Sequence, residues 1–185
     1  NTASPVICKP LAHGAAIVMH SLTKYIGGHG TSIGGIVVDG GNFDWIKDRK
    51  RQPLLNEPDQ SYGGAVWADA VPQLTGANIP FVIRLRVVLL RDLGAPLSPF
   101  NAFQLIQGLE TVGLRMKQHC SNAEKVVSFL ETQKKVTNVI YPTNHQGEIK
   151  ERAKKYMQGG YGSLVGMDVG TKEAGAKFID NLKML

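Results

Sequence analysis

Two hydroxyls and one lysine lie close together in residues 15–30, between a short apolar run and a group of glycines. Ser21 and Thr23 are two positions apart, and Lys24 follows directly. If the chain stays extended here, both hydroxyls point to one face of a strand and Lys24 points to the other. Hydroxyls can donate hydrogen bonds to a phosphate, and a neutral amine can form an imine with an aldehyde. The glycines that follow allow positive φ and close approach to a ligand: Gly27, Gly28 and Gly30.

This set of groups suits pyridoxal 5'-phosphate, which carries both an aldehyde and a phosphate. Lys24 is therefore a candidate for the lysine that binds this cofactor covalently. The residues alone leave a plainer alternative open, because a lysine after a strand is usually a solvated edge residue and Ser and Thr are common in loops. Residues 21–24 also match the Ser-x-x-Lys motif of penicillin-binding enzymes. The Lys-Thr-Gly and Ser-Asp-Asn motifs that those enzymes need do not occur in the chain.

The composition is that of an ordinary globular protein. Of the 185 residues, 43% are hydrophobic and 19% are charged, and no apolar run is long enough for a membrane helix. The two cysteines, Cys8 and Cys120, have no metal or redox spacing, which favours a reducing, cytoplasmic compartment. The five histidines show no metal-ligand spacing, so we expect no metal. Because no apolar run is long enough for a membrane helix, we expect no membrane partner either.

The chain is basic, with a net charge of +6 and its densest cluster at residues 47–51. Nucleic-acid binding would require basic residues interleaved with aromatic residues on one surface. Here the cluster is typical of the solvated end of a short helix, which we predict for residues 42–50 with Asn42 as its cap. We therefore expect no nucleic-acid partner. A non-catalytic basic interaction domain remains the alternative from a different functional class.

Apolar patterns predict two neighbouring strands at residues 16–19 and 33–39. A helical turn at residues 11–14 is predicted before them. Residues 51–64 are polar and are predicted to form a long surface loop. Two helices follow, one disturbed by Pro72 and one stopped by Gly94; they are predicted at residues 65–77 and 81–93.

A long helix is predicted from Ser98-Pro99 through Gln133, because serine caps helices and proline suits the first helical position. Gly108 and Gly113 can mark a kink or close helix contacts. This pattern fits two structures equally well. One is a single long helix that bridges two domains, and the other is a pair of helices with a bend near Gly113. The remaining pattern predicts the start of a small α+β domain. Its strands are predicted at residues 136–141 and 164–169, and its helices at residues 148–157 and 173–185.

Several motifs resemble the Cys/Met-metabolism family of pyridoxal-phosphate enzymes. Residues 20–30, His-Ser-Leu-Thr-Lys-Tyr-Ile-Gly-Gly-His-Gly, are similar to the family's cofactor-lysine segment. Residues 30–39, followed by Phe43-Asp44-Trp45, are most similar to the O-acetylhomoserine sulfhydrylase branch, which the insert at residues 51–64 also favours. The resemblance covers nearly the whole chain, through residues 91–94, 97–103, 107–111, 114–116, 119, 141–142 and 177–179.

This resemblance implies an α/β fold of the aspartate aminotransferase type. Residues 1–133 would be the C-terminal part of the large cofactor-binding domain, including the long bridging helix. Residues 134–185 would begin the C-terminal small α+β domain. The resemblance also implies that Lys24 holds pyridoxal phosphate and acts as the base, and that Ser21 and Thr23 bind its phosphate.

The implied reaction is a γ-replacement that converts O-acetyl-L-homoserine and sulfide into L-homocysteine and acetate, in methionine and cysteine biosynthesis. Sibling reactions on the same scaffold remain alternatives: cystathionine γ-synthase, cystathionine γ-lyase and methionine γ-lyase. No residue decides between sulfide and cysteine as the acceptor. The resemblance further implies a cytoplasmic homotetramer built as a dimer of dimers.

Compared with the family pattern, the chain looks like an interior segment. It lacks the aspartate that precedes the Asn1–Thr2 pair and contacts the cofactor's ring nitrogen, and it is one residue short between Thr2 and Pro10. The carboxylate-binding arginine of the family also lies outside the chain. Family members are roughly twice this length, in keeping with two domains per chain. The 185 residues are therefore expected to be inactive on their own.

Overall fold

The chain divides into two compact units, each of which is described by itself. The structure, a computed structural model, describes residues 3–184, so the Asn1–Thr2 pair and Leu185 of the predictions above lie outside the described residues. The described part of the first unit is Lys9–Glu110, and the second unit comprises Ala3–Cys8 and Thr111–Leu185. The assignment of residues 1–133 and 134–185 to two domains stays a prediction.

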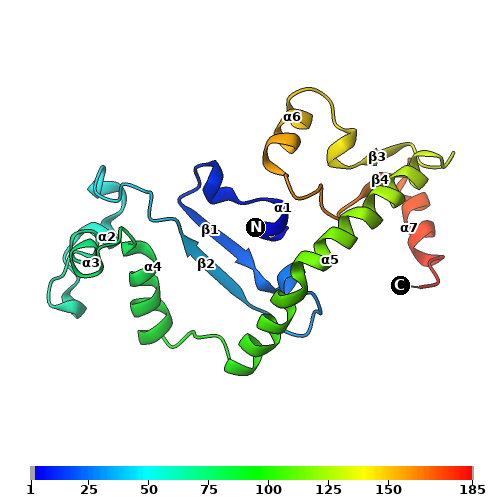
Figure 1. Cartoon of the computed structure of the whole chain (residues 1–185). Coiled ribbons are helices and arrows are strands. Elements are labelled where there is room, and N and C mark those ends of the chain that lie inside the picture. Colours follow the sequence, from blue (N-terminus) through cyan, green and yellow to red (C-terminus); the bar gives the residue numbers. More distant parts are fainter. Residues whose placement is uncertain (1–2, 185) are drawn as a thin grey trace. The chain divides into compact units, whose positions relative to one another are not determined.

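The first unit contains an antiparallel pair of strands, β1 (Ile17–Ser21) and β2 (Gly35–Asp39), shown in Figure 1. Their register places Ser21 opposite Gly35 and Ile17 opposite Asp39. The predicted pairing of the two apolar runs is confirmed. Side chains alternate along β1: Val18 and His20 are buried, whereas Met19 is 67% exposed. One face of β1 is therefore open in this chain. The helical turn that was predicted before the first strand is η1 (Pro10–His13).

Helical segments surround an aromatic core in the first unit. They are α2 (Pro53–Asn56), η4 (Gln60–Tyr62), α3 (Trp67–Thr75) and α4 (Pro80–Arg84), which continues into the wider turns of η5 (Leu85–Asp92). The buried core consists of Trp45, Leu55, Trp67, Ala68 and Val71. The ring of Trp45 stacks on that of Phe81 at a centroid distance of 5.6 Å. The two helices predicted on either side of residues 78–80 are confirmed.

Two expectations for residues 42–64 are wrong. The predicted helix over residues 42–50 is replaced by turns, and only η3 (Arg49–Arg51) is helical there. The carboxylate of Asp44 accepts hydrogen bonds from the backbone N–H groups of Ile46 and Lys47, and this local bonding competes with helix formation. Residues 51–64 are not simply a surface loop, because α2 buries Leu55 in the core.

A single helix, α5 (Pro99–Glu131), runs from the first unit into the second. It begins directly after Ser98, whose carbonyl accepts a hydrogen bond from the N–H of Ala102 at 2.9 Å. Pro99 occupies the first helical position, where a missing N–H leaves no helical bond unmade. The predicted long helix is thereby confirmed. The structure contains one continuous helix and not two helices with a bend near Gly113.

The second unit packs an antiparallel strand pair against the C-terminal half of α5. Strands β3 (Asn138–Ile140) and β4 (Gly166–Asp168) pair with Asn138 opposite Asp168. Its buried core consists of Ala123, Val127, Val139 and Tyr141. The remaining segments of this unit are α1 (Ser4–Ile7), η6 (Pro142–Asn144), α6 (Gly147–Tyr156) and α7 (Lys172–Asp180). The predicted strands and helices are present, although α7 ends at Asp180, earlier than expected.

Residues 3–184 contain no membrane-spanning helix, metal-binding cluster or disulfide. No single helix there is long and apolar enough to cross a membrane; only the bent pair Trp67–Thr75 and Pro80–Asp92 meets the length and composition criteria together. No three His, Cys, Asp or Glu side chains of this range are grouped so that they could hold a metal ion. Cys8 and Cys120 form no disulfide.

Candidate active site

Lys24 lies on a wide helical turn that directly follows β1. This turn, η2 (Leu22–Ile26), is closed by two hydrogen bonds of 2.8 Å, from the N–H of Gly27 to Leu22 O and from the N–H of Gly28 to Lys24 O. Lys24 departs from helical geometry within it, with φ −87° and ψ −131°. The chain therefore does not stay extended through Lys24, so the alternation of strand faces does not place the side chains beyond Ser21.

The hydroxyl of Thr23 holds the two ends of the 22–34 loop together. Its Oγ1 accepts a hydrogen bond from the N–H of Gly34 at 3.0 Å and lies 3.4 Å from Gly34 O. The N–H of Leu22 donates to the same carbonyl at 2.9 Å. The end of β1 and the start of β2 are thereby fixed beside each other. The bond to the Gly34 carbonyl is long, so the Thr23 hydroxyl hydrogen can turn to another acceptor at small cost.

Ser21 and Lys24 present their polar groups differently from Thr23. Among the described residues, the Ser21 hydroxyl has no hydrogen bond, and the side chain is half-buried at the end of β1. Lys24 is exposed. The Nδ1 atom of His29 lies 2.8 Å from Gly27 O, so this histidine is bonded within the glycine loop. The structure thus brings one exposed amine and two hydroxyls into one short stretch at the end of a strand.

The N-terminal half of α5 packs against this loop, a contact that sequence reasoning did not assign. Ser32 is buried, and its hydroxyl donates a hydrogen bond to Gln104 Oε1 at 2.5 Å. Leu105 and Gly108, on the same helix, are buried. The one available signal in the sequence was Gly108, an unusual residue inside a strongly helical pattern.

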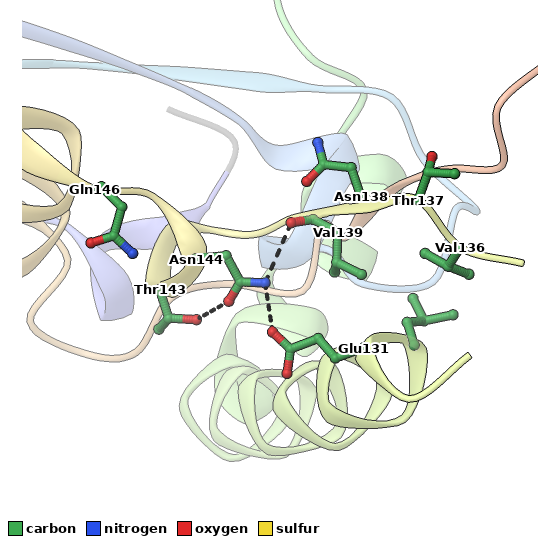
Figure 2. Close-up of a pocket in the computed structure, with 9 residues that line it drawn as sticks. Glu131, Val136, Thr137, Asn138, Val139, Thr143, Asn144 and Gln146 are labelled. Carbon is green, nitrogen blue, oxygen red and sulfur yellow. Dashed lines mark hydrogen bonds between the residues drawn. The ribbon is translucent and has the colours of Figure 1, made fainter. Parts of the chain in front are cut away.

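A separate hollow of about 520 Å³ lies in the second unit, between the end of α5, β3 and η6 (Figure 2). Asn144 Nδ2 donates to Glu131 Oε1 at 2.9 Å and to Val139 O at 3.3 Å, and Thr143 donates to Asn144 Oδ1. The nine residues that line the hollow include no lysine and no arginine. This hollow therefore offers no amine for an aldehyde and no cation for a phosphate, in contrast to the Lys24 turn.

The fold and the lysine turn fit one class of enzyme, and comparison with known proteins defines it. The family model of Cys/Met metabolism PLP-dependent enzymes matches residues 1–185. The chain therefore belongs to the Cys/Met metabolism family of PLP-dependent enzymes. The expected family and fold class are thereby confirmed.

Two relatives show which enzymes of this family the chain resembles. An O-acetyl-L-homoserine sulfhydrylase from Leptospira meyeri is 46% identical over 186 residues, covering 98% of this chain and 42% of the relative. A homocysteine synthase from Schizosaccharomyces pombe is 42% identical over 179 residues, covering 96% of this chain and 41% of the relative.

A solved structure gives the same result. The crystal structure of an O-acetylhomoserine (thiol)-lyase from Campylobacter jejuni matches with a TM-score of 0.85 and 34% identity, covering 100% of this chain and 45% of that one. That crystal structure carries N'-pyridoxyl-lysine-5'-monophosphate. This chain thus spans less than half the length of the relatives it matches.

Proposed function

We propose that this chain belongs to an O-acetylhomoserine sulfhydrylase and contributes Lys24, Ser21 and Thr23 to its pyridoxal-phosphate site. The observation that carries the proposal is the similarity of nearly the whole chain to sulfhydrylases and homocysteine synthases. The activity is proposed for the full-length protein, by which we mean a protein of its relatives' length that contains this chain.

The groups on the Lys24 turn fit the chemistry of the cofactor. An aldehyde requires an amine that it can reach, and Lys24 is exposed on its turn. A phosphate requires hydrogen-bond donors, and the Ser21 hydroxyl has no competing bond among the described residues. The Thr23 hydroxyl can donate to a phosphate while its oxygen continues to accept from the N–H of Gly34. The donor set is therefore compatible with a phosphorylated aldehyde.

Lys24 has a second role in the proposed reaction. When bound, pyridoxal phosphate supplies an electron sink for the substrate carbons next to the amino group. With the cofactor bound, the Lys24 amine would serve as the base that removes a proton from the substrate Cα and then one from Cβ. Ser21 and Thr23 hold the phosphate and so fix the distance between Lys24 and these carbons.

The overall change is a replacement at the γ-carbon of the substrate. The bond from Cγ to the acetate oxygen breaks, acetate leaves, and a sulfide sulfur forms a new bond to Cγ. The protons that Lys24 removed return to Cβ and Cα, and the product is L-homocysteine. Because acetate takes the electron pair of the broken bond and sulfide supplies the pair of the new one, no oxidant or reductant is required.

The setting of the enzyme follows from the same resemblance and is likewise proposed. We expect a homotetramer in the cytoplasm that acts on a small amino-acid substrate and sulfide, in methionine biosynthesis. We also keep the proposal that residues 1–133 belong to the large domain and residues 134–185 to the small one. Sedimentation of the full-length protein would test the tetramer.

The substrate assignment is tested by assaying the full-length protein with one acyl donor and two acceptors. With O-acetyl-L-homoserine and sulfide, we expect homocysteine and acetate in equal amounts, detected by chromatography. With cysteine in place of sulfide, we expect much slower formation of cystathionine. A preference for cysteine, or release of a keto acid without any added acceptor, would reject the sulfhydrylase in favour of a sibling synthase or lyase.

A further inference from the structure

We propose that Gly108 of α5, with Gln104 and Leu105, positions the turn that carries Lys24. This inference rests on the proposed role of Lys24 but concerns residues other than the three proposed to bind the cofactor. The basis is a direct contact between the backbone of α5 and the backbone of the turn, within the first unit.

Gly108 permits this contact because it has no side chain. A Cβ atom at position 108 would lie 2.1 Å from Gly27 O and 2.7 Å from the carbonyl carbon of Gly27. Real Cβ atoms essentially never approach another heavy atom closer than 3.0 Å. Any side chain at position 108 would therefore push the helix away from Gly27, because the obstructing atoms belong to the backbone and cannot rotate aside.

Leu105 fills the space beside two glycines of the same loop. A Cβ at Gly27 would lie 2.8 Å from Leu105 Cδ2, and a Cβ at Gly34 would lie 2.7 Å from Leu105 Cδ1. The Leu105 side chain is 5% exposed. One side chain of α5 thus packs against Gly27, inside the 22–34 loop, and against Gly34, the residue to which Thr23 is hydrogen-bonded.

Gln104 adds a polar contact to Ser32, close to the end of the loop. It accepts the hydrogen bond of the buried Ser32 hydroxyl, so helix and loop are joined by a bond with a defined direction as well as by packing. Gly108 follows Gln104 by four residues and Leu105 by three, about one helical turn in each case, so the three residues share one face of α5. This face therefore contacts the loop at three places.

The position of Lys24 depends on Gly27 through the hydrogen bonds of the turn. The N–H of Gly27 bonds to Leu22 O, and the N–H of the next residue bonds to Lys24 O. A displacement of Gly27 is therefore passed to Lys24 through the short turn that carries both. Misplacement of a reacting group by about 1 Å can lower a rate by about a hundredfold.

The test compares Gly108→Ala with Gly113→Ala in the full-length protein. Both substitutions place alanine in the same helix, but a Cβ at Gly113 meets no atom within 4 Å in the described structure. The first measurement is hydrogen exchange of the Gly27 and Gly28 amides without cofactor. We expect exchange at least about tenfold faster in Gly108→Ala and unchanged in Gly113→Ala, since only the first disturbs the turn.

The second measurement uses the cofactor-loaded protein. We expect Gly108→Ala to move the pH midpoint of the visible absorbance of the lysine-bound cofactor and to lower kcat by about a hundredfold, as for misplaced catalytic groups. Gly113→Ala should leave both unchanged. Equal amide exchange and equal pH midpoints in the two variants would overturn the positioning role.

A milder substitution keeps the proposal testable if Gly108→Ala does not fold. Gln104→Ala removes the bond to Ser32 without creating a clash, and Gln104→Glu retains an acceptor. We expect Gln104→Ala to speed exchange of the Gly27 and Gly28 amides and Gln104→Glu to restore it. Unchanged exchange in Gln104→Ala would contradict the proposal. If the wild-type protein binds no cofactor, the proposed function fails, whereas the exchange experiment still tests the contact.

Discussion

Thr23 and Ser21 differ in their hydrogen bonds. Substitutions at these two positions should therefore affect the stability of the fold differently, although both should weaken cofactor binding. The Thr23 oxygen accepts the N–H of Gly34, whereas the Ser21 hydroxyl has no hydrogen bond among the described residues. Thr23→Val keeps the shape but leaves the Gly34 N–H without its acceptor. We expect this change to lower the free energy of unfolding by about 1–3 kcal/mol. Urea unfolding of the cofactor-free full-length protein measures it.

Ser21→Ala gives the complementary result. Its expected effect on unfolding stays within about 0.5 kcal/mol, because it removes no bond of the described structure. Both variants should bind pyridoxal phosphate more weakly, by about tenfold or more, because a hydrogen bond to a charged group contributes about 1.5–3 kcal/mol. Titration followed by absorbance gives the Kd values. A Ser21→Ala protein with wild-type affinity would remove Ser21 from the phosphate site.

Tyr141 makes stability in the second unit depend on alkaline pH. Its side chain is 1% exposed, and its hydroxyl donates to Gly162 O at 2.8 Å. Burial, with smaller contributions from Cys120, Glu124 and Tyr161, raises the pKa of Tyr141 from 10.0 to about 12. Because the folded pKa is the higher one, Tyr141 contributes stability below pH 10 that is lost as the pH rises from 10 to 12.

The expected result is a fall in unfolding free energy between pH 10 and 12 that is smaller in Tyr141→Phe. At neutral pH the same variant should be less stable by about 1 kcal/mol, because it leaves the Gly162 carbonyl without its donor. Equal pH dependence in the two proteins would show that another group titrates.

At the scale of elements, an ion pair joins η3 to α3. Arg49 binds both carboxylate oxygens of Asp69, at 2.7 and 2.9 Å, and each side chain is 43% exposed. The hydrogen bond from Arg49 holds the pKa of Asp69 below its usual value of 3.8. Because the folded pKa is depressed, the pair contributes stability above the unfolded pKa and loses it as the pH falls through the folded value.

Asp69→Asn should therefore weaken the acid dependence of unfolding below about pH 4, the ordinary range of aspartate titration. At pH 7 the loss should remain below about 1 kcal/mol, because exposed ion pairs are screened by solvent. Acid unfolding curves of wild-type protein and Asp69→Asn measure this. Parallel curves would mean that the pair contributes nothing.

The elements predicted from sequence are those with strong periodic patterns. The paired strands and α5 show this, since apolar spacing and the Ser98-Pro99 start depend only on nearby residues. The prediction of a helix over residues 42–50 was wrong because the Asp44 carboxylate accepts hydrogen bonds from the nearby backbone N–H groups of Ile46 and Lys47. The partner of Gly108 was not predictable, because Gly27 lies far from it in the sequence.

At the scale of the whole molecule, the chain exposes many large apolar side chains along α5. They include Phe100, Phe103, Ile106, Leu109, Leu114, Val126 and Phe129. Exposed apolar patches of this kind normally mark surfaces that another part of a protein covers. We therefore expect the 185 residues produced alone to bind an apolar dye and to aggregate, and to show no turnover. A monodisperse, active 185-residue protein would contradict this.

The central claim is that Lys24 binds the cofactor, and borohydride trapping tests it most directly. The full-length protein is incubated with pyridoxal phosphate, reduced, digested and analysed by mass spectrometry, beside Lys24→Ala and the control Lys47→Ala, which removes another exposed lysine. We predict a pyridoxyl group on Lys24 in wild-type protein and in Lys47→Ala, and none in Lys24→Ala. A modified lysine elsewhere, with Lys24 unmodified, would contradict the account.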